Sequence, residues 1–317
     1  MEWLTMDDVT RLYLRQWFVS GGKRGIVHIV HGMAEHAGRY ERLAKKLNAE
    51  GYEVWAADQR GHGRTADKSA NDPGKGGLLG HCNDTDGFAR VTADIDQINR
   101  QIRKDNPLIP LFLLGHSWGS FIAQNYIESC LGTGGESVKL AGCILSGTRG
   151  PAGIQAAAGF PVMSFLAFII GCRKGSRLAR AMADGPYNKP FKPNRTSADW
   201  LSRDNAEVDA FVADPLCGNL CSVGFYRDLA GGLKKIHQNE AFGRIPAELP
   251  VYVFSGSADP VGDMGLSVTE LVNIYRKIGI KDLEFVLYPD ARHETLNETN
   301  REEVTANLLS WLNKHTT

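Results

Sequence analysis

The sequence has 317 residues, and 43% of them are hydrophobic, so the chain can bury a large α/β core that carries an insertion. Its 36 basic and 36 acidic residues balance, which argues against binding to nucleic acid or to anionic membranes through net charge. The N-terminal residues lack the basic and apolar regions of a secretory signal. The six cysteines are scattered without zinc-binding spacing, so we expect a cytoplasmic protein with free thiols.

Predicted strands and helices alternate in the first half of the chain. An alternating strand over residues 12–19 leads through a Gly21-Gly22 turn into a β-branched strand over residues 26–30, and we expect these two strands to form a hairpin. Three further strands are expected at residues 52–57, 111–114 and 140–146. Apolar residues at helical spacing predict helices at residues 40–47, 88–102 and 118–130.

The regular alternation is lost between residues 149 and 243 and then resumes. Strands are expected at residues 251–256 and 283–288, with helices at residues 266–278 and 299–312. Repeated strand–helix units predict a mostly parallel sheet with helices on both faces. We therefore expect an α/β core formed by residues 1–148 and 244–317. Residues 149–243 are expected to form a cap above the C-terminal strand ends, where ligands bind in open α/β sheets.

The motif Gly115-His116-Ser117-Trp118-Gly119 stands between a predicted buried strand and a predicted helix. In that context, Gly-x-Ser-x-Gly is typical of a nucleophile elbow, a tight turn that lifts a serine hydroxyl above the end of a sheet. The turn forces the serine into strained backbone angles, and Gly115 and Gly119 remove side chains that would collide. The amides at the start of the following helix can stabilise negative charge. We therefore predict Ser117 as a nucleophile.

A serine nucleophile needs an imidazole base, and the base needs a carboxylate that fixes its tautomer. In proteins with such an elbow, the chain order is serine, acid, histidine. Three histidines follow the elbow at usable positions. His237 lies among lysines at the edge of the insertion, and His315 is expected to fray near the C-terminus. His293 follows the last predicted strand in a loop, so we predict His293 as the base.

The acid is expected at the end of the strand that precedes the loop of His293. Asp259 occupies this position, directly after Gly256-Ser257-Ala258, and Asp263 and Asp290 are the alternatives. Asp290 shares the loop of His293, where an aspartate is typical of a turn. We therefore predict Asp259 as the acid.

An acyl-transfer site also needs two main-chain N–H donors for the oxyanion of the tetrahedral intermediate. One donor is expected from Trp118, the residue after the nucleophile, and the other from the loop His31-Gly32-Met33 after the earlier strand. In this loop we predict the N–H of Met33 as the donor.

Several motifs carry a family resemblance. They are His31-Gly32-x-x-Glu35-His36-x-Gly38-Arg39-Tyr40, Asp58-x-Arg60-Gly61-His62-Gly63, Gly115-His116-Ser117, Asp214-Pro215-Leu216, Gly256-Ser257-x-Asp259 and Arg292-His293-Glu294-x-x-Asn297-Glu298. From about residue 10 to the C-terminus, the chain resembles the monoacylglycerol lipase/lysophospholipase branch of the α/β-hydrolases, which is similar to the serine aminopeptidase S33 group. The resemblance implies an α/β-hydrolase fold and a serine hydrolase that cleaves small acyl esters of glycerol or lysophospholipid type, without a cofactor or a metal.

By position, the resemblance also implies the roles of individual residues. It carries over Ser117, Asp259 and His293 as the catalytic triad and Met33 and Trp118 as the oxyanion amides. It places Glu35, Arg39 and His116 near the polar head of the substrate. Many relatives have Met in place of Trp118, so this bulky side chain is expected to alter the shape of the acyl pocket.

Two other functions stay open. A serine aminopeptidase of the same fold would need cap carboxylates that hold a free amine, and Glu207, Asp209 and Asp214 are the candidates. A non-catalytic receptor would use the same fold to bind a small ligand without turnover.

The uncharged segment of residues 150–172 is long enough to span a membrane. However, glycines and Pro161 interrupt it, and a span would separate Ser117 from Asp259 and His293, so we expect no transmembrane span. We expect either a buried cap helix or an apolar lid that lines an acyl tunnel and touches lipid aggregates.

Overall fold

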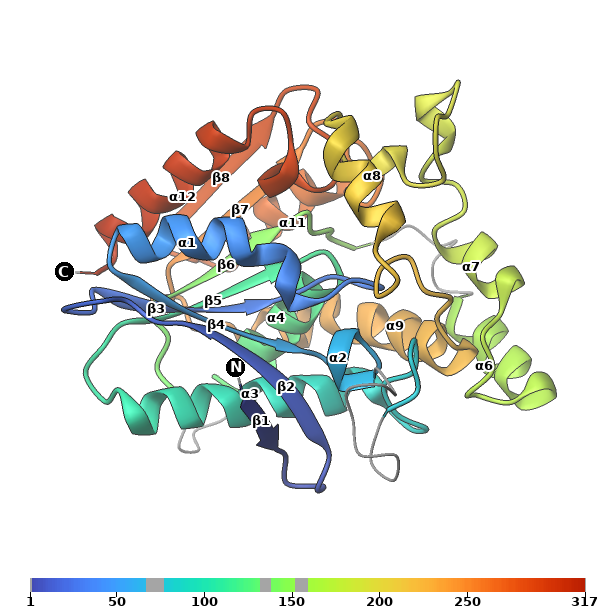
Figure 1. Cartoon of the computed structure of the whole chain (residues 1–317), viewed down its shortest axis with the longest axis horizontal. Helices are drawn as coiled ribbons and strands as arrows, with labels where there is room; N and C mark the ends of the chain where they lie inside the picture. Colours follow the sequence, from blue (N-terminus) through green and yellow to red (C-terminus); the bar gives the residue numbers. More distant parts are fainter. Residues whose placement is uncertain (1, 67–76, 132–137, 152–158, 317) are drawn as a thin grey trace.

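The computed structural model describes residues 2–66, 77–131, 138–151 and 159–316. Across these residues, one eight-stranded sheet has the order β1-β2-β4-β3-β5-β6-β7-β8 (Figure 1). The strands are β1 (Glu2–Thr5), β2 (Arg11–Trp17), β3 (Gly25–Val30), β4 (Tyr52–Asp58), β5 (Leu111–His116), β6 (Gly142–Ser146), β7 (Val251–Gly256) and β8 (Leu283–Tyr288). From β4 to β8 in this order all pairings are parallel, whereas β1 and β2 pair antiparallel. The mostly parallel sheet that the sequence predicts is confirmed.

The first two strands differ from the sequence prediction. β2 does not form a hairpin with β3, because β4 lies between them. Trp17 of β2 and Val27 of β3 are both opposite Val54 of β4. The Gly21-Gly22 turn therefore connects two strands that flank a third. The sequence also misses β1, whose residues are exposed or half-buried and leave no apolar pattern.

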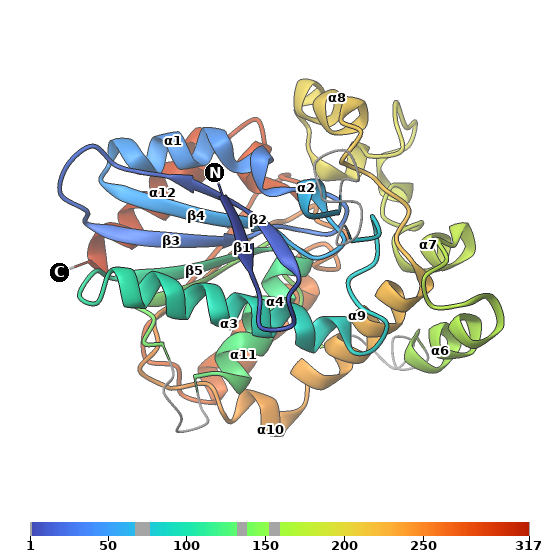
Figure 2. The ribbon, with the colours of Figure 1, turned by 60° about the horizontal axis from the view of Figure 1, so that its bottom comes forward.

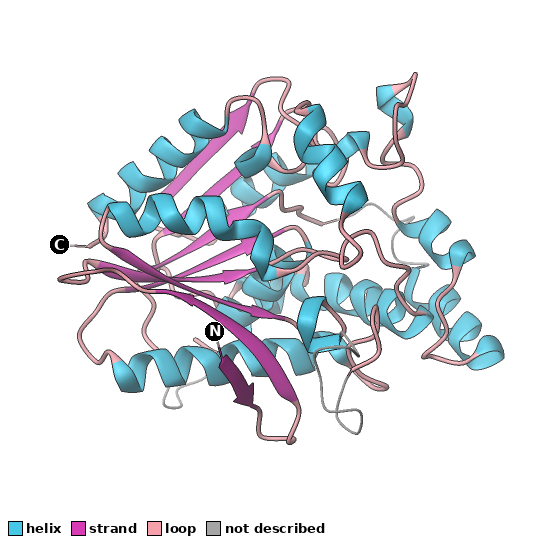
Figure 3. Ribbon diagram, viewed as in Figure 1, coloured by secondary structure: helices cyan, strands magenta, loops and turns pink. Residues whose placement is uncertain are grey.

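Helices cover both faces of the sheet, as the alternation predicts (Figure 3). α1 (Glu41–Ala49) and α12 (Arg301–Lys314) cover one face, where their apolar side chains form a buried cluster with β3, β4 and β5. α3 (Gly87–Asp105), α4 (Trp118–Ser129) and α11 (Leu266–Lys277) contribute to a second buried cluster on the other face. The sheet is therefore buried on both sides, and its C-terminal strand ends are left for the site.

The chain between β6 and β7 forms the helices of the expected cap. They are α6 (Gly159–Ile170), α7 (Arg177–Ala183), α8 (Asn205–Ala213), α9 (Val223–Ile236) and α10 (Asn239–Phe242). α6, α7 and α8 lie beyond the C-terminal ends of the parallel strands (Figure 2). In contrast, α9 packs against α3 and α4, and its Phe225 and Ile236 join their apolar cluster. The domain boundaries at residues 149 and 243 stay a prediction.

The apolar segment of residues 150–172 is described in part, because residues 152–158 lie outside the described residues. No described helix is long and apolar enough to cross a membrane. In α6, the side chains of Met163 and Ala167 are buried, whereas those of Phe165 and Phe168 are exposed. α6 therefore packs on one side and presents an apolar surface on the other.

Two glycines allow β3, β5 and α4 to pack closely around the elbow. A Cβ atom added to Gly119 would lie 2.1 Å from the carbonyl oxygen of Val30. A Cβ atom added to Gly115 would lie 2.4 Å from the carbonyl oxygen of Gly119. Both distances are far below van der Waals contact, so the main chain would have to move. The collisions that the sequence predicts are confirmed, and their partners are main-chain atoms.

We expect Gly119→Ala to lower the free energy of unfolding by about 3 kcal/mol, because the added methyl group overpacks the junction of α4 with β3. Urea unfolding followed by circular dichroism measures this as a lower midpoint. Gly22→Ala is the matched control, since a Cβ there meets no atom within 4 Å. Equal midpoints for the two variants would contradict the close packing.

Candidate active site

Ser117 lies at the turn between β5 and α4 in a strained backbone conformation. Its φ of 53° and ψ of −124° are rare for a residue that carries a side chain. The N–H of Ser117 donates to the carbonyl oxygen of Ser146 at the end of β6 (2.9 Å), which anchors the turn. This geometry fits a nucleophile elbow.

His293 and Asp259 form a buried pair in the loops after β8 and β7. Nδ1 of His293 lies 3.0 Å from each carboxylate oxygen of Asp259. The carboxylate also accepts from the Ser255 hydroxyl (3.1 Å) and from the N–H of Val261 (2.8 Å), so its orientation is fixed. Since an ionised carboxylate only accepts, Nδ1 carries the proton and Nε2 keeps a lone pair that can take a proton.

The charge around His293 favours its role as a base. Burial alone would lower its pKa, but the Asp259 carboxylate, together with Glu294 and Glu35, outweighs burial and raises the pKa above 6.5. His116 lies beside it, with ring centroids 4.8 Å apart, and burial lowers the pKa of His116 to about 4. At neutral pH, the ring of His116 is therefore uncharged, and His293 is the ring of this pair that can accept a proton.

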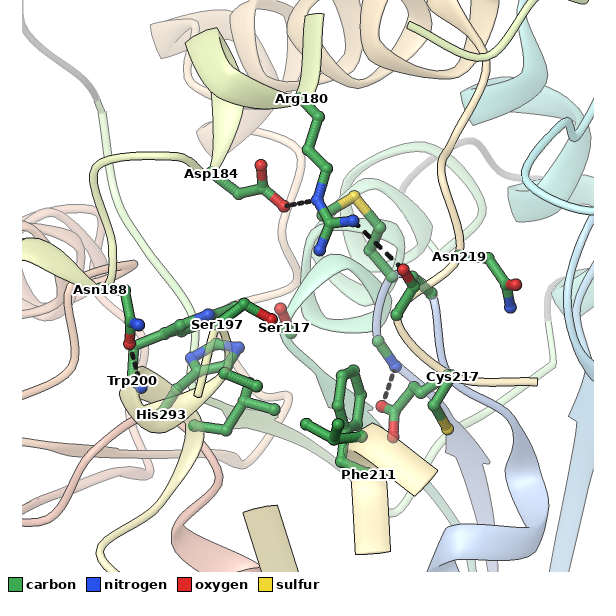
Figure 4. A pocket seen from close by; sticks show the side chains of 18 of the residues that line it. Ser117, Arg180, Asp184, Asn188, Ser197, Trp200, Phe211, Cys217, Asn219 and His293 are labelled. Atoms are coloured by element: carbon green, nitrogen blue, oxygen red, sulfur yellow. Dashed lines mark hydrogen bonds and ion pairs between the residues drawn. The ribbon is translucent and has the colours of Figure 1, made fainter. Parts of the chain in front are cut away.

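Ser117 and His293 both line a cavity of about 530 Å³ below the cap (Figure 4). The core contributes the loop from Gly32 to Glu35, His116 and Glu294. The cap contributes polar and apolar side chains, among them Arg180, Asp184, Asn188, Trp200, Leu201 and Phe211. Figure 4 shows Arg180 reaching down from α7 toward the part of the cavity that holds Ser117. The insertion between β6 and β7 therefore contributes a large part of the lining of this cavity.

The loop after β3 lies directly against the serine. A Cβ atom added to Gly32 would lie 3.1 Å from Cβ of Ser117. The N–H of Gly32 is taken, because it donates to Oε1 of Glu35 (2.5 Å). In the part of the chain that the structure describes, neither the N–H of Met33 nor that of Trp118 donates to a protein acceptor. These two amides can therefore receive an oxyanion, and this role stays a prediction.

The side chain of Trp118 does not line the cavity, in contrast to the sequence expectation. It is buried and stacks on His62 at a centroid distance of 5.2 Å, with Phe225 of α9 at 5.0 Å on another side. Nδ1 of His62 in turn bonds the carbonyl oxygen of Arg60, so His62 braces its own loop. The Trp118 side chain therefore does not shape the cavity, because α4 turns its first side chain into the core.

Three residues that the resemblance places near a substrate head group lie close together. Glu35 and His116 line the cavity, whereas Arg39 does not. Nη1 of Arg39 bonds Glu35 (2.7 Å), and both Nη atoms bond Glu294 (2.6 and 2.7 Å). Contact of these residues with a head group stays a prediction. Sequence reasoning misses the role of Glu294, although an acidic residue beside the predicted base was a usable signal.

Trp200 is a second cavity residue that sequence reasoning misses. It lies in the short helix η3 (Asp199–Leu201) of the cap. Its ring centroid is 5.0 Å from that of His293, and its carbonyl oxygen accepts from the N–H of His293 (3.4 Å). The cap has no regular apolar periodicity at this point, so the sequence contains no signal for the contact.

The alternative histidines and acids lie elsewhere. His237 ends α9, and His315 follows α12; neither lines the cavity. His315 is not frayed, because its ring nitrogens bond the Trp311 carbonyl oxygen (2.7 Å) and Asp282 (3.0 Å). Asp263 and Asp290 are both exposed turn residues with positive φ.

The three candidate amine-binding carboxylates of an aminopeptidase do not line the cavity. Glu207 pairs with Arg42, Asp209 with Arg195 and Asp214 with His36. The cap carboxylate that does line the cavity is Asp184, which sequence reasoning misses. Asp184 lies 3.6 Å from Nε of Arg180, and burial raises its pKa.

Among the described residues, His36, Asp214 and Cys217 form a group whose arrangement could hold a metal ion. The N–H of Gly38 donates to Nδ1 of His36 (3.1 Å), so the neutral ring carries its proton on Nε2, which donates to Asp214 (2.9 Å). A metal would need the lone pair of Nε2 and a thiolate. Burial raises the pKa of Cys217, so the group favours hydrogen bonding over metal binding.

The sheet order, the elbow and the cap define the chain as an α/β-hydrolase. Solved structures agree with this class. The crystal structure of a thermostable carboxyl esterase from Bacillus coagulans in complex with glycerol matches with a TM-score of 0.88 and 27% identity, over 100% of this chain and 99% of that chain. A soluble variant of the Saccharomyces cerevisiae monoglyceride lipase, in complex with a substrate analog, matches with a TM-score of 0.73 and 24% identity, over 100% and 95%.

Sequence comparisons place the chain within this class. The family model of serine aminopeptidase, S33, matches residues 21–300. Monoacylglycerol lipase of Mycolicibacterium smegmatis is 30% identical over 311 residues, which cover 96% of this chain and 94% of the relative. Monoglyceride lipase of Rattus norvegicus is 28% identical over 263 residues, which cover 82% and 73%. The chain belongs to the serine aminopeptidase S33 family of α/β-hydrolases, and it is a serine hydrolase of carboxylic esters.

We expect Asp259→Asn to lower the pKa of His293, because burial remains while the facing charge is lost. NMR titration of the ring measures this pKa directly. Asp263→Asn is the control, since this exposed aspartate was an alternative acid. A shift in the Asp263 variant, with none in the Asp259 variant, would reverse the assignment.

Proposed function

We propose that the enzyme cleaves carboxylic esters of the monoacylglycerol or lysophospholipid type through Ser117, His293 and Asp259, with an acyl-enzyme intermediate. One observation carries the proposal. His293, which is bonded to the buried Asp259, lines the same cavity as a serine held in elbow geometry. The names of the relatives from M. smegmatis and R. norvegicus support the substrate class.

In the proposed reaction, Nε2 of His293 takes the proton of the Ser117 hydroxyl while Oγ attacks the ester carbonyl carbon. The N–H groups of Met33 and Trp118 stabilise the oxyanion that forms. The imidazolium of His293, stabilised by Asp259, gives its proton to the leaving alcohol as the ester C–O bond breaks. Water then attacks the acyl-Ser117 ester by the same route and releases the acid.

The lining of the cavity supports a substrate with a polar and an apolar part. Met33, Leu201 and Phe211 offer apolar surface, whereas Glu35 and His116 are polar. We place the polar head of the substrate near Glu35 and His116. A volume of about 530 Å³ lies in the range of small-molecule sites.

An aminopeptidase activity is the second candidate, because Asp184 puts a cap carboxylate on the cavity. A free amine of a substrate could pair with this carboxylate. Turnover of aminoacyl amides that exceeds turnover of a matched ester, and that falls in Asp184→Asn, would support this candidate over the ester hydrolase.

Ser117→Ala should lower kcat/KM for a short p-nitrophenyl ester by about a million-fold, as the loss of a serine nucleophile does in serine proteases. Ser164→Ala is the control, because this hydroxyl bonds its own helix α6 and does not line the cavity. Absence of turnover by the wild-type protein would instead support a non-catalytic receptor.

We also propose that the cap touches lipid aggregates. Phe165 and Phe168 of α6 are 69% and 84% exposed, and Ile169 of α6 and Leu178 of α7 are also exposed. α6 and α7 lie beyond the C-terminal ends of the parallel strands (Figure 2), so this exposed apolar surface belongs to the end of the molecule that carries the cap. The six cysteines are free thiols, which supports a reducing, cytoplasmic location.

Replacing both Phe165 and Phe168 by Ser should weaken cosedimentation with phosphatidylcholine vesicles by about a hundredfold, since each aromatic side chain loses its burial in lipid. Hydrolysis of a water-soluble ester should stay at the wild-type rate. Leu108→Ser is the matched control, because Leu108 is 91% exposed but lies in the loop before β5, at the opposite end of the strands. Equal binding by both variants would exclude α6 as the contact.

A further inference from the structure

Arg39 holds two carboxylates that belong to different loops, one after β3 and one after β8. It lies in the short helix η1 (Ala37–Tyr40). Its guanidinium bonds Glu35 through one nitrogen (2.7 Å) and Glu294 through both terminal nitrogens (2.6 and 2.7 Å). The three side chains are only 12%, 4% and 5% exposed, so the pairs are shielded from water. Such charge-assisted, forked hydrogen bonds fix both distance and angle.

Each carboxylate is attached to a different part of the proposed machinery. Oε1 of Glu35 accepts from the N–H of Gly32 (2.5 Å) and from the Tyr40 hydroxyl (2.9 Å). Gly32 directly precedes Met33, so Glu35 sets the loop that presents a proposed oxyanion amide. Glu294 directly follows His293. One guanidinium therefore connects the oxyanion loop with the loop of the base.

We propose that Arg39 is a positioning residue that fixes the distance and orientation of the Met33 amide relative to His293, and that it does not bind the substrate. This inference rests on the proposed Ser117 mechanism. It accounts for the observation that Glu35 and Glu294 line the cavity, whereas Arg39 does not. Three hydrogen bonds from its two terminal nitrogens go to these two carboxylates.

The same cluster adds charge near the base. Two carboxylates share one guanidinium, and the pKa values of both Glu35 and Glu294 are lowered although burial opposes this, because Arg39 lies between them. The cluster therefore carries one net negative charge. His293 also faces Asp259 from the loop after β7 and the neutral ring of His116 from β5. The net charge of the cluster adds to that of Asp259 in stabilising the imidazolium.

Two conservative variants separate these effects. Glu294→Gln keeps a hydrogen-bond acceptor and removes one charge, so the pKa of His293 should fall. Since His293 acts as a base in its neutral form, the acidic limb of the kcat/KM profile should move to lower pH by roughly one unit. Arg39→Lys keeps the charge and loses the fork, so the acidic limb should stay in place while kcat falls by about a hundredfold.

A pair of substrates distinguishes positioning from head-group binding. Glycerol and ethyl esters of one acyl chain differ only in the head group. In Arg39→Lys, kcat should fall equally for both esters, with little change in KM. A rise in KM for the glycerol ester alone, with kcat unchanged, would overturn the proposal and make Arg39 a ligand of the head group. An unmoved acidic limb in Glu294→Gln would overturn the electrostatic part.

Arg301→Lys is the matched control, because Arg301 pairs with Asp204 (2.7 Å) away from the cavity. Both kinetic constants should stay at wild-type values. Thermal unfolding of each variant shows that it is folded, and NMR titration of His293 in Glu294→Gln tests the charge effect without turnover. If Ser117→Ala retained full activity, the proposed function itself would fail, and this outcome differs from each result above.

Discussion

The geometry of the site depends on the close approach of α4 to β3 at Gly119. Because no side chain separates the main chains there, the start of α4 sits directly beside the loop that follows β3. The two proposed oxyanion amides belong to these elements, because Trp118 begins α4 and Met33 lies in the loop after β3. On a wider turn, Ser117 would keep its hydroxyl but would lie farther from both proposed donors. Ser117 itself has strained backbone angles at this junction.

Burial and contact with a carboxylate have opposite effects on the pKa values of the histidines near the site. His31, His62 and His116 are all buried near the site, and burial lowers their pKa values to about 3, 4 and 4. His293 is equally buried, yet its pKa is raised, because it alone among these four rings bonds a carboxylate directly. Among these four rings, only His293 therefore has a stabilised charged form. The contact with Asp259 separates the predicted base from the three other rings.

Much of this site could be predicted from the sequence. The elbow at Ser117 and the strand-end positions of Asp259 and His293 follow from local patterns, because parallel strands bring their C-terminal ends to one edge. Other features could not be predicted. The pairing of β2 with β4 depends on which strands meet in space, and the Gly21-Gly22 turn looks the same in either topology. Three further features depend on contacts between residues that are distant in the chain. They are the direction of the Trp118 side chain, the position of Asp184 in the cavity lining and the bond between Arg39 and Glu294.

The central claim is that Ser117, His293 and Asp259 act as one unit. Labelling with a fluorophosphonate, followed by mass spectrometry of the digested protein, tests this claim most directly. The account predicts one adduct, on Ser117, whose rate of formation falls by orders of magnitude in His293→Ala. An adduct on another residue, or labelling of Ser117 at the wild-type rate in His293→Ala, would contradict it.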